Sequence, residues 1–437
     1  MPERLHLQMG LAERDSKVIW HPFTQQINRL PPIAITRGEG IFLTDDTGKQ
    51  YIDAISSWWV TLHGHGNAYI AEKIYRQALQ LEQVIFAGFT HEPAVALAER
   101  LLPLLPGNPA RIFYSDNGST STEVALKMAI QYWWNRKRES GTATLPDRRK
   151  ILAFRNSYHG DTFGAMSVSD RSVFTLAFHD LLFEVIFIDT PCAGNIRQLE
   201  QLVQESATEI AAFIYEPLVQ GAGGMNMYES RYLDELLVAV KRNNILCIAD
   251  EVMTGFGRTG KLFASEWMTE TPDIICLSKG LTGGTMALGV TACSERIYEA
   301  YNSRDPLQTF FHGHSFTANP LACTAALASL DLLLEKDCLE RIAAIARCQQ
   351  SFRDVLSLSP GVRQARCLGT IVAFEIEHGK KEYLNEISAV FTQQALARNV
   401  YLRPLGNTVY LMPPYCITVA QLETVQSVVL EILRSLI

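Results

Sequence analysis

The sequence predicts an α/β protein in which a mostly parallel sheet covered by helices is joined to a smaller α+β domain. Short apolar runs alternate with segments of helical period between residues 111 and 293, and such alternation is typical of parallel sheets. Near residue 330 it gives way to a mixture of helices and short strands. The 437 residues, 47% hydrophobic and 19% charged, suit a globular chain of two or three domains.

We therefore expect three segments. Residues 1–60 would be an N-terminal segment joining the small domain, residues 61–330 the large domain, and residues 331–437 the C-terminal small domain.

The N-terminal segment is rich in turns. After a polar, irregular stretch to about Asn28, it predicts a hairpin with strands at Ile33–Ile35 and Ile41–Thr44, closed by residues 37–40. The run Ser56–Trp59 follows without helical period, so its two tryptophans are either a plug of the core or the wall of a pocket. Helices are predicted next, at Ile70–Leu81 and Glu92–Leu102.

The sheet and the C-terminal domain follow in order. Sheet strands are expected at Arg111–Tyr114, Ile151–Phe154, Ala211–Tyr215, Ile245–Ala249, Ile274–Leu277 and Leu288–Cys293. Helices are expected between them at Thr122–Arg136, Ser230–Arg242 and Leu321–Leu334. The last hundred residues predict helices at Leu339–Leu356 and Glu386–Arg398, and strands at Ile371–Ile376, Tyr401–Pro404 and Thr408–Met412.

Charge and cysteine content argue against several classes of function. The net charge of −7 leaves no sequence-wide positive field to hold nucleic acid or an anionic membrane. The nine cysteines include no C-x-x-C pair and several lie in apolar runs, as in a reducing compartment. No run approaches a membrane span, and the N-terminus lacks the apolar core of a signal peptide. We expect a cytoplasmic protein that acts on small molecules.

Lys279 is the residue around which we predict the chemistry. It closes the apolar run Ile274–Leu277, and Asp250 closes a second such run. Strands of an open parallel sheet end at one edge, where ligands bind. A lysine among apolar walls has a lowered pKa and an amine that can attack a carbonyl. An isolated lysine would more often reach a surface loop, so its neighbours decide.

Other strand ends add polar groups to the same edge. Ser115–Thr122 places small polar residues at the start of a helix, where they either bind a phosphate or only cap the helix. A second strand leads into Tyr158, His159 and Asp161, and a third ends in Glu216. Taken singly, each of these could be an ordinary polar loop.

Two further motifs are set aside. Gly255–Lys261 has the glycines and the lysine of a P-loop, but Leu262 stands where that motif needs a hydroxyl for magnesium. No metal site is predicted from the paired histidines of glycine loops, which lack partner cysteines: His63 with His65, and His312 with His314.

One ligand would use all the groups at the sheet edge. Pyridoxal 5′-phosphate has a phosphate, a flat ring, a ring nitrogen that an acid keeps protonated, and an aldehyde that reacts with a lysine. Asp250 would hold the proton on the ring nitrogen. Lys279 would carry the cofactor and then move a proton at the substrate carbon.

The chain resembles the class III (ω-type) aminotransferases, which have the aspartate-aminotransferase-like PLP fold type I. The resemblance is strongest in Asp250-Glu251-Val252, Gly255-Phe256-Gly257-Arg258-Thr259-Gly260, Pro272-Asp273-Ile274 and Ser278-Lys279-Gly280. It extends over nearly the whole chain through Trp20–Thr24, Ser56–Trp59, Asn156–Ser167, Val219–Met225, Leu281–Gly284, Phe311–Phe316 and Arg403–Gly406.

The resemblance implies a role for each site residue. Lys279 and Asp250 would be catalytic. Cofactor-binding residues would be Gly118, Ser119, Tyr158, Glu216, Asp250, Val252, Lys279, His314 and Ser315, with Tyr158 and Val252 on opposite faces of the cofactor ring. Substrate-binding residues would be Phe23, Trp58, Tyr158, Asp161, Gly313 and Arg403, the last binding a carboxylate through its guanidinium. Gly313-His314-Ser315 would reach the site of the neighbouring subunit, which implies a homodimer.

Within the family, the chain looks most like the biotin-synthesis branch, which converts 8-amino-7-oxononanoate to 7,8-diaminononanoate with S-adenosyl-L-methionine as amino donor. Phe23 stands where users of that donor are expected to have tyrosine, so the ring is kept and the hydroxyl is lost. Lysine as donor, or another class III ω-aminotransferase reaction, is the alternative. Decarboxylation and racemisation share the cofactor site, whereas a non-catalytic binding protein would need neither Lys279 nor Asp250.

Overall fold

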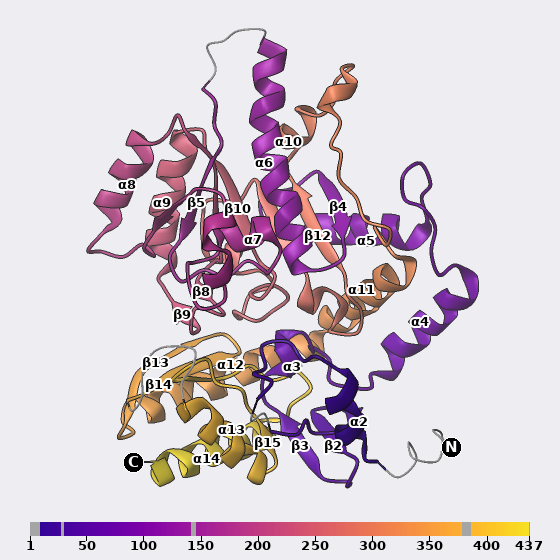
Figure 1. Cartoon of the computed structure of the whole chain (residues 1–437), viewed down its shortest axis with the longest axis vertical. Coiled ribbons are helices and arrows are strands. Elements are labelled where there is room, and N and C mark those ends of the chain that lie inside the picture. The colour runs from indigo at the N-terminus through magenta and orange to yellow at the C-terminus, as the bar shows by residue number, and fades with distance from the viewer. Residues whose placement is uncertain (1–8, 28–29, 141–145, 378–385, 437) are drawn as a thin grey trace.

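The computed structural model describes residues 9–27, 30–140, 146–377 and 386–436. Its central feature is a seven-stranded sheet of order β4-β12-β11-β10-β7-β5-β6 (Figure 1). The strands are β4 (Arg111–Ser115), β5 (Lys150–Phe154), β6 (Val185–Ile188), β7 (Ile210–Tyr215), β10 (Leu246–Asp250), β11 (Ile274–Leu277) and β12 (Gly289–Cys293). Neighbouring strands are parallel except β12, which is antiparallel to β11 and to β4. The predicted fold class, α/β with a mostly parallel sheet, is confirmed.

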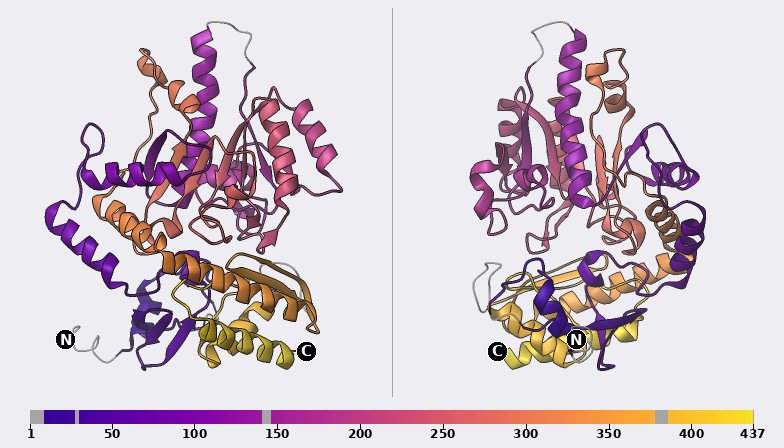
Figure 2. Two further views of the ribbon diagram at one scale, coloured as in Figure 1. Left: turned by 180° about the vertical axis from the view of Figure 1, so that it is seen from behind. Right: turned by 45° about the vertical axis from the view of Figure 1, so that its right-hand side comes forward.

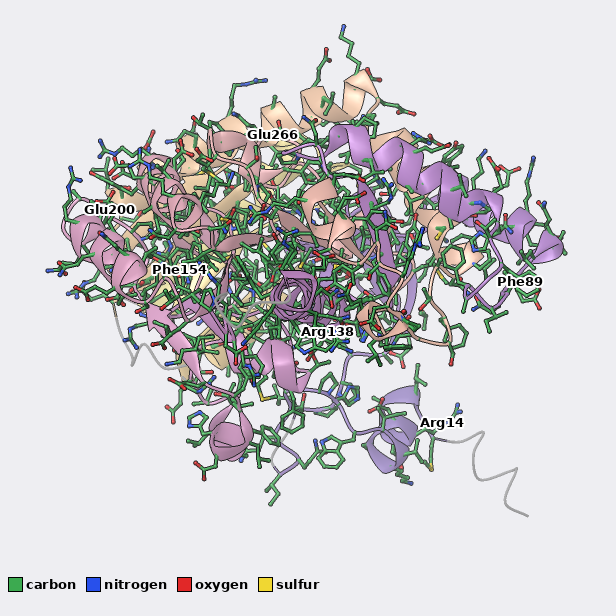
Figure 3. The ribbon with its side chains drawn as sticks, turned by 90° about the horizontal axis from the view of Figure 1, so that it is seen from above. Arg14, Phe89, Arg138, Phe154, Glu200 and Glu266 are labelled. Atoms are coloured by element: carbon green, nitrogen blue, oxygen red, sulfur yellow. The ribbon has the colours of Figure 1, made fainter. Side chains whose placement is uncertain are left out.

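The sheet is buried on both faces because successive residues of each strand point to opposite sides. In β10, Ile248 belongs to one apolar cluster and Ala249 to another. Helix α6 (Gly118–Ser140) packs Val124 into the first cluster, and α9 (Ser230–Arg242) packs Leu233 into the second. In Figure 3, Phe154 lies in this buried interior, whereas Phe89 lies at the exposed edge of the molecule.

Further helices and turns surround this sheet. The helices are α4 (Ala68–Gln80), α5 (Glu92–Leu101), α7 (Phe163–Val168), α8 (Ile196–Glu205), α10 (Glu295–Glu299) and α11 (Pro320–Leu333). The short 3-10 helices are η1 (Leu102–Leu104), η2 (Leu176–Leu181), η3 (Ala264–Trp267), η4 (Lys279–Thr282) and η5 (Pro306–Gln308). A small hairpin pairs β8 (Val219–Gln220) with β9 (Asn226–Met227). Within the described ranges, no helix has the length and apolar character that crossing a membrane requires.

A second group of elements combines segments from the early and the late parts of the described chain (Figure 2). One sheet contains β1 (Ile35–Glu39), β2 (Phe42–Asp45), β3 (Gln50–Asp53) and β15 (Val400–Tyr401), with β15 parallel to β3. Another contains β13 (Val362–Leu368), β14 (Ile371–Ile376) and β16 (Thr408–Leu411). The helices are α2 (Leu11–Val18), α3 (Ser56–Trp59), α12 (Lys336–Ser357), α13 (Glu386–Ala397) and α14 (Val419–Leu436). We propose that this group is the small domain, to which residues 1–60 contribute.

Several elements differ from the sequence-based expectation. Helix α2 lies in the stretch expected to be irregular, and it buries none of its residues, so no apolar face announces it. Strand β1 includes Arg37–Glu39, which we expected in the hairpin turn, because this strand is mostly exposed and polar. Strands β6 and β13 and helices α8 and α14 were not predicted at all. For α14 the signal was present, since its buried Leu422, Val425, Val429 and Ile432 have helical spacing.

Candidate functional site

A cavity of about 630 Å³ lies at the carboxyl edge of the seven-stranded sheet. It is lined from the start of α6 and from the segments that follow β5, β7, β10 and β11. The structure brings these predicted site residues together around it: Gly118, Ser119, Tyr158, Asp161, Glu216, Asp250, Val252 and Lys279.

The N-terminus of α6 forms one end of the cavity. The first N–H groups of a helix have no acceptor within it, and the helix dipole adds positive potential there, so such an end attracts an anion. Gly118 is required at this point because a Cβ added to it would lie 2.8 Å from Val252 Cγ1. The hydroxyl of Ser119 accepts a hydrogen bond from the N–H of Asp161 at 3.2 Å, which ties the helix start to the loop after β5.

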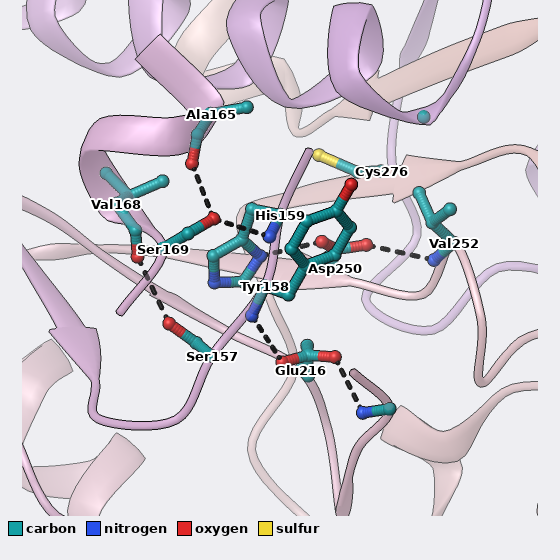
Figure 4. A network of polar contacts seen from close by, with 12 residues as sticks. Ser157, Tyr158, His159, Ala165, Val168, Ser169, Glu216, Asp250, Val252 and Cys276 are labelled. Carbon is teal, nitrogen blue, oxygen red and sulfur yellow. Dashed lines mark hydrogen bonds and ion pairs between the residues drawn. The ribbon is translucent and has the colours of Figure 1, made fainter. Parts of the chain in front are cut away.

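A buried carboxylate, Asp250, contributes to the cavity from the end of β10 (Figure 4). Asp250 is 5% exposed, and its Oδ2 lies 2.7 Å from Nδ1 of His159. Its Oδ1 accepts the N–H of Val252 at 3.0 Å. His159 is itself buried, so the two side chains hold one another in place and the carboxylate has a fixed direction.

Glu216 supports the loop that carries Tyr158 (Figure 4). Its carboxylate accepts the N–H of Tyr158 at 3.1 Å and the N–H of Gly221 at 2.9 Å. Burial raises the pKa of Glu216 to about 7 against the opposing effect of His159, with a smaller contribution from the neighbouring carboxylate of Asp250. Burial also raises the pKa of Tyr158 well above that of a free phenol, with the nearby carboxylate of Asp161 acting in the same direction. The Tyr158 ring therefore remains a neutral, flat surface.

Lys279 lies two residues beyond β11, in the first position of η4. Its φ of 46° is in the left-handed region, which residues with a Cβ adopt only where their surroundings enforce it. Its Nζ lies 4.6 Å from the centre of the Trp59 ring. Burial lowers the pKa of Lys279 to about 8, although the carboxylates of Asp250 and Glu216 oppose the shift. The amine is therefore neutral far more often near physiological pH than an ordinary lysine, although the protonated form still predominates.

Three of the predicted substrate residues lie outside the cavity lining and gather beside one another. The rings of Phe23 and Trp58 meet edge to face at 5.5 Å, and the guanidinium carbon of Arg403 lies 5.0 Å from the Trp58 ring centre. Phe174 joins Phe23 at 5.7 Å and Tyr158 at 6.4 Å. This aromatic entrance (Phe23, Trp58, Phe174 and Arg403) leads to the cavity through Tyr158.

The remaining predicted residues, Gly313, His314 and Ser315, also do not line the cavity. The carbonyl of Ser315 accepts a hydrogen bond from the Gln83 side chain at 2.7 Å. His314 Nδ1 lies 3.3 Å from a carboxylate oxygen of Asp116.

Three residues near the site were not assigned a role from the sequence. His159 was noted without its partner, since nothing in the sequence pairs it with a residue 91 positions away. Arg258 is 1% exposed and donates to the carbonyls of Pro413 and Trp59 at 2.9 and 3.4 Å, although a fully buried arginine has no sequence signature. Trp59 lies against Lys279. The pair of adjacent tryptophans was the sequence feature that could have identified it as a site residue.

The cavity thus contains a helix N-terminus that can bind an anion, a carboxylate of fixed orientation, a flat aromatic ring, and an amine of lowered pKa. Those four features match the phosphate, the ring nitrogen, the ring face and the aldehyde of pyridoxal 5′-phosphate. Among the described residues, no group of three or more His, Cys, Asp or Glu side chains could hold a metal ion.

Comparisons with known proteins agree with this chemistry. The family model described as aminotransferase class-III matches residues 24–433. An adenosylmethionine-8-amino-7-oxononanoate aminotransferase of Synechococcus elongatus is 46% identical over 427 residues, covering 95% of this chain and 98% of that protein. The structure of the enzyme of that name from Methanocaldococcus jannaschii has a TM-score of 0.91 and 32% identity, covering 97% and 98% of the two chains. A PLP-bound amine transaminase from an uncultivated Pseudomonas species has a TM-score of 0.86 and 32% identity, covering 94% and 97%.

Proposed function

The chain belongs to the class III aminotransferases, and we propose that it transfers an amino group from S-adenosyl-L-methionine to 8-amino-7-oxononanoate. The product would be 7,8-diaminononanoate, an intermediate of biotin synthesis. The observation that carries this proposal is the 46% identity, over nearly the whole of both chains, to the Synechococcus elongatus enzyme named for those substrates. The amphipathic aromatic entrance supports it, because a long-chain oxo acid has an apolar stem and a terminal carboxylate.

The enzyme takes pyridoxal 5′-phosphate as its cofactor, as its family does. When bound, the cofactor draws electrons from the substrate carbon that bears the nitrogen, so that this carbon can lose and regain a proton. Gly118 and Ser119 would hold the phosphate with the N–H groups of the α6 start. Tyr158 and Val252 would enclose the ring, and Asp250, oriented by His159, would keep the ring nitrogen protonated.

Lys279 has two tasks in this proposal. Its neutral amine would hold the cofactor through the aldehyde at rest, and the same amine, once free, would move a proton at the substrate carbon. A pKa near 8 suits both tasks, since the amine must be neutral to attack and basic enough to take a proton. The ring of Trp59, 4.6 Å from the amine, gives this transfer an apolar wall.

The lowered pKa gives a pH prediction. A lysine attacks an aldehyde only when neutral, and its neutral fraction rises as the pH passes its pKa. Cofactor capture by enzyme stripped of cofactor should therefore accelerate with pH and level off above about pH 8, whereas an ordinary lysine would continue to gain up to about pH 10.4. Stopped-flow absorbance at a series of pH values measures this rate, and a rate that still climbs steeply at about pH 10 would contradict the assignment.

Arg403 is proposed to bind the terminal carboxylate of the oxo acid. Arg403→Lys should raise the apparent KM for 8-amino-7-oxononanoate by about tenfold, because a point charge cannot replace two parallel N–H donors. The affinity for the cofactor should stay unchanged, since Arg403 lies at the entrance and not in the cavity lining. Initial-rate kinetics and cofactor titration separate the two quantities, and a loss confined to cofactor affinity would make Arg403 a structural residue.

The amino donor is tested by offering each candidate separately. We expect 7,8-diaminononanoate to form with S-adenosyl-L-methionine and not with lysine, because Phe23 retains a ring that can stack on adenine. Phe23 is 43% exposed although its ring packs edge to face with Trp58 and with Phe174, so part of the residue is accessible to a ligand. Product formation with lysine alone would replace the proposed donor, and no product with either would refute the proposed acceptor.

We further propose that the enzyme is a cytoplasmic homodimer in which Gly313, His314 and Ser315 complete the partner's site. All nine cysteines are free, which suits a reducing compartment. Exposed apolar side chains flank the segment, namely Phe311 at 73% and Phe316 at 63%. Apolar groups gathered in this way mark an interface. Sedimentation should therefore give twice the mass of one chain, and a monomer that is fully active would exclude a shared site.

A further inference from the structure

The tryptophan turn, Ser56–Trp59, has an unusual backbone. Ser56, Ser57 and Trp59 have φ values of 54°, 59° and 67°, and Ser57 combines its φ with a ψ of −91°. Glycine adopts such angles readily, whereas residues with a Cβ adopt them only where the surroundings hold them. The turn contains no glycine, so other groups must maintain it.

The carboxylate of Asp53 is placed to hold this turn. Asp53 ends β3 and is fully buried, at 0% exposed. Its Oδ2 accepts the N–H of Ser57 at 2.6 Å and the Ser57 hydroxyl at 3.2 Å, while its Oδ1 accepts the N–H of Ile55 at 3.2 Å. The ring of His65 adds a contact to Oδ2 at 2.9 Å. One carboxylate therefore joins the end of β3, the tryptophan turn and the segment around His65.

The two tryptophans depend on this turn to different degrees. Trp59 is 4% exposed, and its ring N–H donates to the hydroxyl of Tyr410 at 2.9 Å. Trp58 is 42% exposed, and it faces Phe23 and Arg403 on the open side of the turn. The position of Trp59 is thus secured by the core, whereas that of Trp58 rests on the backbone that carries it.

We propose that Asp53 is a positioning residue for the amino acceptor. By holding Ser57, its carboxylate fixes the ring of Trp58 against Arg403, and this sets the affinity of the entrance for a long-chain oxo acid. The inference rests on the proposed function, which names that acceptor. Asp53 touches no reacting atom, and Trp59 and Lys279 have their own contacts, so the chemical step stays unchanged.

The test compares Asp53→Asn, Trp58→Phe and the double variant as full-length holoenzymes. Asparagine keeps the shape of the side chain but removes the negative charge of the carboxylate that Ser57 and His65 contact. Asp53→Asn should raise KM for 8-amino-7-oxononanoate roughly fivefold to tenfold, with kcat within about twofold of wild type. In the Trp58→Phe background the same change should alter KM by less than about twofold, because the effects of substitutions at two coupled sites are not additive.

Asp45→Asn is the matched control. Asp45 ends β2 of the same sheet, is 8% exposed, and accepts the N–H groups of Thr47 and Lys49, each at 2.9 Å. It holds a turn that does not reach the entrance, so its loss should lower the melting temperature without raising KM. The proposal is overturned if Asp45→Asn raises KM as much, if Asp53→Asn leaves KM unchanged, or if its effect persists in full without Trp58.

Two further measurements test the role of Asp53 if Asp53→Asn does not fold or if the acceptor is not a substrate. If Asp53→Asn does not fold, His65→Ala removes one contact that orients the carboxylate and should raise KM about twofold to threefold. Near-ultraviolet circular dichroism needs no substrate: Asp53→Asn should change the tryptophan signal in the wild-type background and not in Trp58→Phe. A wild type that binds cofactor but does not aminate the oxo acid refutes the proposed function, and the tryptophan signal then decides the role of Asp53 alone.

Discussion

Replacement of Lys279 by alanine should abolish transamination and leave the fold intact. In the proposed mechanism the amine of Lys279 would both hold the cofactor at rest and transfer the proton, and no other side chain is proposed for either task. The loss should exceed a thousandfold in kcat, on the order of the combined effects of covalent and general acid–base catalysis. The fold should persist because the side chain ends in a cavity, and because alanine, like lysine, carries one Cβ, so the left-handed φ of 46° is no more strained in the variant.

The comparison uses absorbance, turnover and a second lysine. Wild-type enzyme should show a visible band from lysine-bound cofactor that borohydride bleaches irreversibly, and Lys279→Ala should lack it. Lys261→Ala is the control, because Lys261 also lies over a tryptophan ring, at 4.3 Å from Trp267, yet does not line the cavity. It should retain the band and near wild-type turnover. Near wild-type turnover by Lys279→Ala would end the whole assignment.

The seven-stranded sheet was largely predictable because its strands are short, continuous apolar runs that end in chemistry-bearing residues. Asp250 and Lys279 each follow such a run, and a parallel sheet brings the ends of its strands to one edge. Strand β6 is a run of only four residues, most of them half-buried, and so it gives a weak signal. Helix α8, which follows it and buries Ile196, Leu199 and Val203 at helical spacing, was a signal that we did not use. Helix α2 was missed because it buries no side chain, so nothing in its composition distinguishes it from a polar loop.

The residues of the site that belong to a sequence motif were predictable. Those that are brought together only by tertiary packing were not. The sequence left the tryptophans as either a core plug or a pocket wall, and in the structure Trp59 is both, because it is buried in the core and lines the cavity, whereas Trp58 lies outside the cavity lining. Trp59 is buried beside Lys279, whereas Trp58 stands half-exposed beside Arg403. Adjacent residues take opposite roles because the backbone between them departs from regular geometry, and neither composition nor periodicity reveals such a turn.

The pairing of Asp250 with His159 is another feature that the sequence could not supply. The two residues come from the ends of different strands, β10 and β5, which are separated in the sheet by β7. Their contact at 2.7 Å depends on the loop after β5 folding over the intervening strand. The directed carboxylate that results is what makes Asp250 suitable for a ring nitrogen, and its charge can be tested directly.

Asp250→Asn should slow turnover by about tenfold to a hundredfold, because one charge-assisted hydrogen bond to the cofactor is worth ~1.5–3 kcal/mol. Cofactor should remain bound through the α6 start and Lys279. The carboxylate of Asp250 also raises the pKa of Lys279, so its removal should move the plateau of cofactor capture to lower pH.

Asp273→Asn is the matched control for this charge. Asp273 borders the same sheet at the opposite end of β11, where its carboxylate accepts the N–H of Cys247 at 2.8 Å. Its substitution should cost stability and leave both turnover per folded enzyme and the capture plateau unchanged. If Asp250→Asn and Asp273→Asn behave alike, the loss reflects a buried hydrogen bond in general. If only Asp250→Asn slows turnover and moves the plateau of cofactor capture to lower pH, then the Asp250 carboxylate acts through its negative charge on both Lys279 and the ring nitrogen.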